Sequence, residues 1–226
     1  MDPSGHWYGP DDYDRAGIET PEEAIAWYLR VCRGGGCAAK LSGNVPLVSQ
    51  LDYSGKYVNA FSGATKYNAC GEASATMALQ YVGKDVNLNS LTDQAIEKGY
   101  YTPNDQPFTS PANLANILRE NGATVIEGNA PNGDMGRAIL FAHLELDAPV
   151  IVDVTVQTTK EGKDTAHFVV VTELTVDNTV KFNDPYSNGA GAKARSSDWQ
   201  NFSSAWEENS DADIWGGKYW YAAVYP

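Results

Sequence analysis

Three residues of the 226-residue sequence carry the groups that thiol catalysis requires: Cys70, His167 and Asp184. A cysteine attacks a carbonyl carbon as its thiolate, a histidine holds or delivers the proton, and a carboxylate orients the histidine ring. Cys70 opens the segment CGEASATMAL, whose small, Ala-rich composition favours a closely packed helix. Because a helix N-terminus stabilises negative charge, this position favours a thiolate at Cys70.

His167 and Asp184 lie on two segments that we expect to pair as strands. Residues 166–176 and 179–184 are rich in β-branched side chains, and the short turn between them is typical of a hairpin. In such a hairpin the paired residue numbers sum to about 355, which places a residue near 188 opposite His167. Asp184 lies close to that point along the same strand, and a small shift in register brings it to the ring. Strand alternation lets only one residue of the pair Asn183 and Asp184 face the ring. We expect Asp184 to orient His167, with Asn183 as the alternative.

Four short motifs resemble, in order, those of the C39-like branch of the papain-like cysteine peptidases. They are VPLVSQ at 45–50, NACGEAS at 68–74, HFVVV at 167–171 and NDPY at 183–186. The resemblance covers about residues 44–226. It implies a papain-like fold in which Cys70 is the nucleophile and His167 the general base. It also implies that Asp184 orients the base and that Gln50 donates to the oxyanion, the alternative for Gln50 being a surface residue in a loop.

Glu72 departs from the family pattern, in which a proline is frequent at this position. A carboxylate two residues after the thiol suits the helix dipole, but its negative charge opposes thiolate formation. The resemblance therefore predicts the fold more directly than it predicts the activity.

Three functions fit this set of residues. We expect a thiol-dependent hydrolase that cleaves an amide bond, in a peptide or a peptidoglycan crosslink, through a thioester on Cys70. An acyltransferase or transpeptidase would use the same site with an amine in place of water. A catalytically inactive binding module would keep the fold without the chemistry. The expected partner is a peptide or peptidoglycan-like substrate, and the oligomeric state is left open.

The cysteines and histidines do not have the spacing of a metal site, and we expect neither a metal nor a cofactor. Only Cys32 and Cys37 are close in sequence, and they are either a disulfide or two free thiols. Cys70 is unpaired in both cases. His143 lies between apolar residues of a predicted helix, so we interpret it as a surface or core histidine and not as a ligand.

The charge of the chain excludes several partners. Its formal net charge is −13, and its 16 Lys and Arg residues are scattered, which argues against nucleic acid and anionic membranes. No apolar run approaches the roughly 18 to 20 residues of a membrane helix, so we expect a soluble protein. The first residues lack the pattern of a secretory signal. The compartment is left open, with secretion and virion association as alternatives.

The elements that must hold these residues follow an α+β plan, with helices first and an antiparallel sheet afterwards. We expect a helix of about 12 residues after the cap Thr20, and another from Cys70 with Gly83 as its C-cap. Further helices are predicted at 90–98, 110–121 and 134–146, and strands at 150–156, 166–176, 179–184 and 218–225. Residues 1–43 are predicted to be an extension with one helix, and 44–226 a papain-like domain.

Overall fold

A computed structural model of the chain describes residues 17–32, 36–61, 68–102, 108–157, 164–186, 191–208 and 217–226. The α-helices are α1 (Pro21–Val31), α2 (Cys70–Tyr81), α3 (Leu88–Glu97), α4 (Pro111–Glu120), α5 (Gly133–Glu145) and α6 (Trp199–Glu208), and the short 3-10 helices are η1 (Gln50–Asp52) and η2 (Val58–Ala60). The strands are β1 (Ala39–Lys40), β2 (Thr124–Asn129), β3 (Val150–Gln157), β4 (Asp164–Leu174), β5 (Thr179–Asp184), β6 (Lys193–Asp198) and β7 (Trp220–Tyr225).

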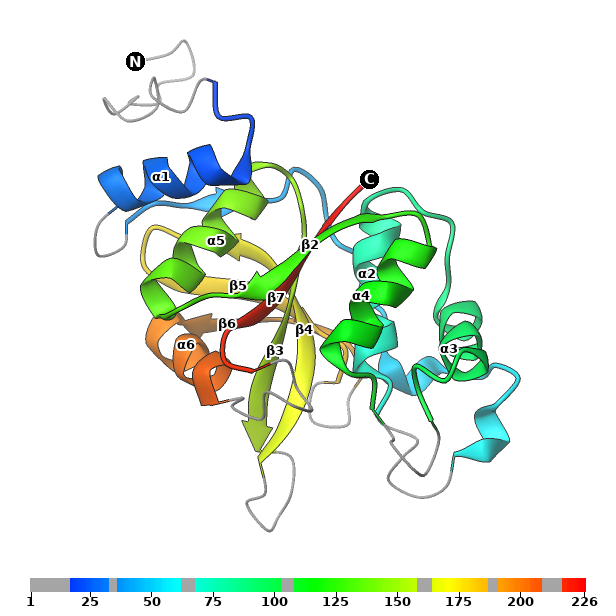
Figure 1. The fold of residues 1–226 in the computed structure, drawn as a ribbon. Helices are drawn as coiled ribbons and strands as arrows, with labels where there is room; N and C mark the ends of the chain where they lie inside the picture. The colour runs from blue at the N-terminus through cyan, green and yellow to red at the C-terminus, as the bar shows by residue number, and fades with distance from the viewer. Residues whose placement is uncertain are drawn as a thin grey trace.

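The strands of the described residues form one antiparallel sheet between two groups of helices. The strand order is β2-β7-β3-β4-β5-β6, and β1 pairs with β4. Figure 1 shows α2, α3 and α4 on one side of the strands, and α1, α5 and α6 on the other. The predicted α+β fold is confirmed.

Helix α2 is packed so closely against β4 that its first turn reaches the strand that carries His167. All its residues from Gly71 to Leu79 are buried. A Cβ atom at Gly71 would lie 3.4 Å from the Phe168 ring, so the close approach depends on a very small residue. The Ser74 hydroxyl donates to the Phe168 carbonyl at 3.1 Å and fixes the helix against the strand.

The predicted helices and strands are confirmed with ends that shift by one or two residues. Strands β1, β2 and β6 and helix α6 were not predicted from the sequence. Strand β6 has the sequence KARSSD and is exposed along most of its length, so it has no apolar alternation to reveal it. It becomes a strand because its backbone pairs with β5 at the edge of the sheet.

The predicted hairpin of β4 and β5 is confirmed, but its predicted register is wrong. Val170 pairs with Asn183, and Glu173 pairs with Lys181. The pairing shifts by one residue between Val171 and Glu173, where a bulge interrupts the ladder. A bulge adds a residue to one strand without an obvious sequence signal, so counting from the turn could not give the register.

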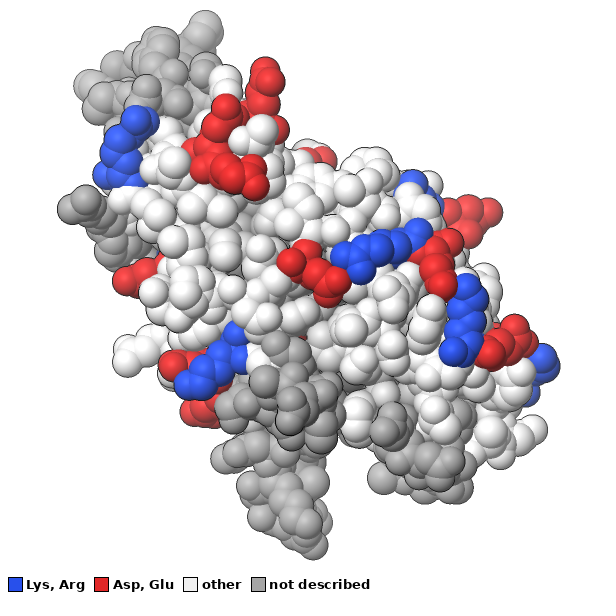
Figure 2. Space-filling model, viewed as in Figure 1, with Lys and Arg blue, Asp and Glu red and all other residues white. Residues whose placement is uncertain are grey.

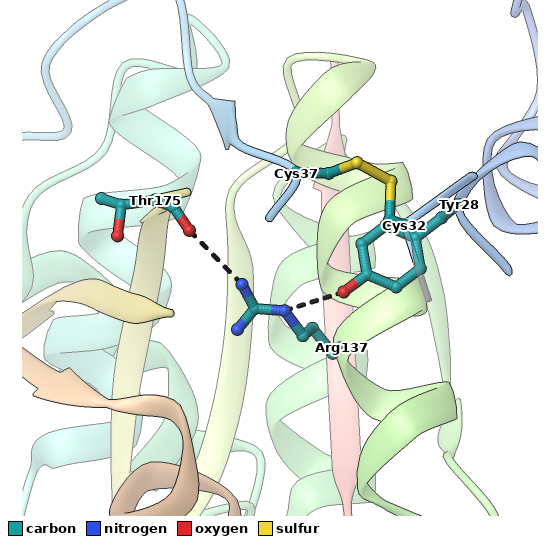
Figure 3. Close-up of a disulfide and its surroundings, with 5 residues drawn as sticks. All are labelled: Tyr28, Cys32, Cys37, Arg137 and Thr175. Carbon is teal, nitrogen blue, oxygen red and sulfur yellow. Dashed lines mark hydrogen bonds between the residues drawn. A yellow bond between two sulfur atoms is a disulfide. The ribbon is translucent and has the colours of Figure 1, made fainter. Parts of the chain in front are cut away.

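The N-terminal helix is fastened to the rest of the protein by aromatic packing and a buried cation. The ring of Tyr28 in α1 packs against Phe141 of α5, with 4.9 Å between ring centroids. Arg137 of α5 donates to the Tyr28 hydroxyl at 2.8 Å and to the Thr175 carbonyl at 3.4 Å (Figure 3). One guanidinium therefore connects α1, α5 and the residue that follows β4.

A disulfide joins Cys32 to Cys37, which decides between the two alternatives that the sequence left open (Figure 3). It links the residue after α1 to the segment that leads into β1. Ala39 of β1 then pairs with Leu174 of β4, so this segment adds to the main sheet. The boundary between an extension of residues 1–43 and a separate domain stays a prediction.

Acidic and basic side chains are mixed on the face shown in Figure 2, where Lys and Arg stand beside Asp and Glu. Arg119 pairs with Glu127 at 2.8 Å, and Lys98 pairs with Glu120 at 2.7 Å. On this face the described residues form no continuous basic patch. None of the helices within the described ranges has both the length and the apolar character needed to cross a membrane.

Candidate active site

Cys70 is a free cysteine at the first position of α2, and it is partly exposed. The residue before it, Ala69, offers no side chain to cap the helix, whereas α1, α3, α4 and α5 each begin after a capping side chain. A missing cap costs about 1 kcal/mol of helix stability. In return, the backbone N–H groups beside the thiol are not occupied by a capping oxygen and can meet a negative charge.

His167 lies on β4 between the thiol and a carboxylate. Its Nε2 atom is 2.7 Å from Oδ1 of Asp184, and both side chains are buried. Burial alone lowers the pKa of His167, but hydrogen bonds with Asp184 and Cys70 outweigh it and raise the pKa to about 10. Since Nε2 faces Asp184, Nδ1 is the ring nitrogen left for the thiol. The geometry favours an imidazolium beside the sulfur atom.

Asp184 ends β5, and every polar contact of its carboxylate favours the charged form. Besides His167, Oδ1 accepts from the Tyr186 backbone N–H at 2.8 Å, and Oδ2 accepts from Nη1 of Arg195 at 3.0 Å. Burial raises the pKa of Asp184, but these bonds and the charge of His167 hold it below its usual value. Nothing in the sequence signals Arg195, because the exposed strand β6 that carries it has no apolar alternation.

Asn183 does not contact the His167 ring. Its side chain is buried, and Nδ2 donates to the carbonyl oxygens of Val45 at 3.0 Å and Pro46 at 3.5 Å. Strand alternation points the two neighbouring side chains in different directions, as expected. Asp184 contacts the His167 ring, and Asn183 contacts the segment that leads to Gln50. Nothing in the sequence signals that Asn183 binds this segment, because Val45 and Asn183 are far apart along the chain.

Gln50 begins η1 and is buried beside the same group of residues. Its backbone N–H donates to the Pro185 carbonyl at 3.1 Å, and η1 also contacts α2. Ser49 caps the turn by accepting from the Leu51 N–H at 3.2 Å. Among the described residues, Oε1 of Gln50 has no hydrogen-bond partner. The Gln50 side chain therefore keeps an acceptor oxygen that no group in the described residues binds.

Glu72 lies two residues after Cys70, and its carboxyl group is fully buried. The Thr109 hydroxyl donates to Oε1, while Oε2 has no partner within the described residues. Burial raises the pKa of Glu72 to about 7, against the smaller lowering effects of Thr109 and of its own backbone N–H. The charge that we expected from the sequence is therefore largely suppressed below neutral pH.

No cluster of three or more His, Cys, Asp or Glu residues that could hold a metal occurs in the described part of the chain. His143 is a core residue with a partner, because its Nδ1 lies 2.7 Å from the Tyr225 hydroxyl. Burial lowers the pKa of His143 to about 4, so the ring is neutral over most of the pH range. The interpretation of His143 as a satisfied core histidine agrees with this contact.

Fold and site together define a papain-like arrangement, in which a thiol at a helix start meets a histidine and a carboxylate from neighbouring strands. Residues 42–214 match the Peptidase_C39 like family, and the chain belongs to this family. This membership supports a cysteine peptidase-type hydrolase. A search of curated proteins found no match to the chain.

Proposed function

We propose that the protein is a cysteine peptidase that cleaves an amide bond through a thioester on Cys70. The observation that carries the proposal is the position of His167. Its Nε2 bonds to Asp184 at 2.7 Å, and its other ring nitrogen is left for the hydrogen bond with Cys70. Thiol catalysis requires a nucleophile that contacts a base, and a carboxylate that contacts and orients that base.

In the acylation step the Cys70 thiolate attacks the carbonyl carbon of the substrate. The carbonyl oxygen becomes an oxyanion, which the Cys70 backbone N–H and the Gln50 side-chain amide would stabilise. As the tetrahedral intermediate collapses, the C–N bond breaks and the His167 imidazolium gives its proton to the leaving amine. The products are a thioester on Cys70 and a free amine.

In the deacylation step neutral His167 takes a proton from water, and the hydroxide attacks the thioester. The C–S bond then breaks, the acid leaves, and the thiolate and imidazolium are restored. Asp184 keeps the ring in place through both steps, and its contacts with Tyr186 and Arg195 keep the carboxylate from turning away. An acyltransferase would differ only in the nucleophile that meets the thioester.

The proposed substrate is a peptide or a peptidoglycan crosslink, both of which present the amide bond that the site would attack. The disulfide between Cys32 and Cys37 supports an exported protein, because disulfides persist in oxidising compartments. Peptidoglycan lies outside the cytoplasm and is therefore accessible to such a protein. A binding module without activity has no observation of its own in its favour.

The test is to incubate the protein with a peptide pool from digested casein and with purified muropeptides, and to identify products by mass spectrometry. The matched control is Cys70→Ala, which keeps the fold and removes the sulfur. We expect products in one of the two pools and a loss of rate of about a thousandfold or more in the variant. Equal product formation by both proteins would contradict the proposal. Products that carry an added amine instead of water would identify acyl transfer.

A further inference from the structure

Glu72 is a buried carboxyl group beside the nucleophile that the proposed mechanism does not use. It is the third residue of α2, one helical turn or less from Cys70, and no part of it is exposed. Its only side-chain partner in the described residues is the Thr109 hydroxyl, at the entry to α4. In the part of the chain that the structure describes, no cation compensates a carboxylate here for its lost hydration, which disfavours the charged form.

The groups around Glu72 also fail to stabilise its charged form. The Tyr101 hydroxyl, after α3, is buried without a partner among the described residues. Burial is the main cause that raises its pKa, and the charges of Glu72 and Cys70 raise it further. On β4, His167 is bonded to Asp184 and Cys70. No basic residue from these elements reaches the Glu72 carboxyl in the described structure.

Among the remaining elements packed against α2, helix α4 carries the basic residue Arg119, which pairs with Glu127 at 2.8 Å, and the other groups are acidic or neutral. Tyr53, which follows η1, donates to Asp93 of α3. Strand β3 contributes Asp153, a buried carboxyl group, and the start of α4 contributes Thr109. In the described residues, none of these groups is a cation that compensates the charge of an ionised Glu72.

We propose that Glu72 is a positioning residue of the thiol site that works in its neutral form. As a neutral acid it holds the first turn of α2 against Thr109 and adds no charge beside Cys70. As a carboxylate it opposes both the Cys70 thiolate and the oxyanion that forms next to it. This role rests on the proposed function of Cys70, and it makes the site most reactive below neutral pH.

The pH dependence gives this role a distinct signature. The pKa of Glu72 is about 7, whereas that of His167 is about 10. On the alkaline side we therefore expect kcat/KM to fall in two separate steps. The first step belongs to Glu72 and reduces the rate by about threefold to tenfold, and the second removes the imidazolium and the remaining activity.

Two variants test the assignment, and Glu208→Gln is the matched control because Glu208 is an exposed glutamate at the end of α6. Glu72→Gln keeps an oxygen for Thr109 but cannot ionise, so the first alkaline step should disappear. Thr109→Val removes a hydrogen bond that lowers the pKa of Glu72, so the same step should move to higher pH. The control should keep both steps where they are in the wild type.

Two readouts separate this inference from the proposed function. The rate of Cys70 alkylation by iodoacetamide needs no substrate, and we expect it to fall between about pH 6 and pH 8 in the wild type but not in Glu72→Gln. Infrared difference spectra over this range should show loss of a protonated carboxyl band in the wild type. In Thr109→Val that loss should occur at higher pH, which keeps the test valid if Glu72→Gln does not fold.

An alkaline step that is unchanged in Glu72→Gln, or a carboxyl band that is already absent at pH 6, overturns the role of Glu72. The proposed function survives that result if Cys70 still reacts rapidly and amide products still form. A Cys70 that reacts no faster than free cysteine in wild type and variants alike overturns the proposed function instead. The infrared titration of Glu72 would then still show whether it is the neutral acid that the geometry indicates.

Discussion

The backbone N–H of Gln50 donates to the carbonyl oxygen of Pro185 at 3.1 Å, which ties the segment that carries Gln50 to the residue after Asp184. Two positions earlier, Asn183 holds the same segment through the carbonyl of Val45. The end of β5 therefore positions two parts of the candidate site at once, the carboxylate at the His167 ring and the segment that carries Gln50.

Replacing Asn183 with alanine should reduce both stability and activity. The substitution removes the hydrogen bonds of Nδ2 to two backbone carbonyls, and the buried bond to Val45 is the costlier loss, about 1 to 3 kcal/mol of unfolding free energy. The segment that carries Gln50 loses an anchor, so we expect kcat/KM to fall by about tenfold. Urea unfolding and hydrolysis rates measure the two effects. A variant with wild-type stability and activity would show that Asn183 does not hold this segment.

Replacing Arg195 with alanine should weaken the site without abolishing it. Arg195 is one of the groups that hold the pKa of Asp184 below its usual value, so its loss raises that pKa. The acid limb of kcat/KM should then move to higher pH, with a loss of about twofold to fivefold at the optimum, because a half-exposed ion pair contributes little in water. Arg195→Lys should restore part of the shift. An acid limb that does not move in Arg195→Ala would show that Arg195 does not lower the pKa of Asp184.

Glu72 should make the stability of the protein depend on pH. Its folded-state pKa, about 7, lies above the ordinary value of 4.5, so its contribution is fully present below about pH 4.5 and is lost as the pH rises through 7. The difference in unfolding free energy between wild type and Glu72→Gln should therefore fall by about 3 kcal/mol over this range. Chemical denaturation at several pH values measures it. A difference that stays constant would show that Glu72 does not titrate in this range.

Removing the disulfide should destabilise the protein and leave the chemistry intact. A closed loop as short as that between Cys32 and Cys37 contributes about 2 kcal/mol through the unfolded state. The double variant Cys32→Ser, Cys37→Ser should lose this much in denaturant unfolding, while kcat/KM at low temperature remains within about twofold of wild type. A large loss of activity in a folded double variant would link the α1 region to catalysis.

The sequence was sufficient to predict the helix that begins at Cys70 and the hairpin that brings His167 to Asp184, because both have strong local patterns. It did not predict Arg195, since β6 is an exposed edge strand whose only signal is backbone pairing. It also could not show that Glu72 is buried. Burial depends on how α2 packs against β4 and on the arrival of Thr109 from another part of the chain.

The same limit explains the hairpin register and the role of Asn183. The bulge between Val171 and Glu173 changes the pairing by one residue, and nothing in the local sequence marks it. Asn183 was considered only as an alternative partner for the ring. Its contacts with Val45 and Pro46 join residues that are distant along the chain, so they emerge only from the tertiary fold.

The most direct test of the thiol site is the rate of Cys70 alkylation by iodoacetamide at about pH 6, in the wild type and in His167→Ala, with peptide mapping to locate the label. Circular dichroism should first show that the variant is folded. We expect wild-type Cys70 to react at least about tenfold faster than free cysteine in the same buffer, and His167→Ala to lose this advantage. Equal rates for wild type, variant and free cysteine would contradict the account, because His167 would then not hold Cys70 as a thiolate.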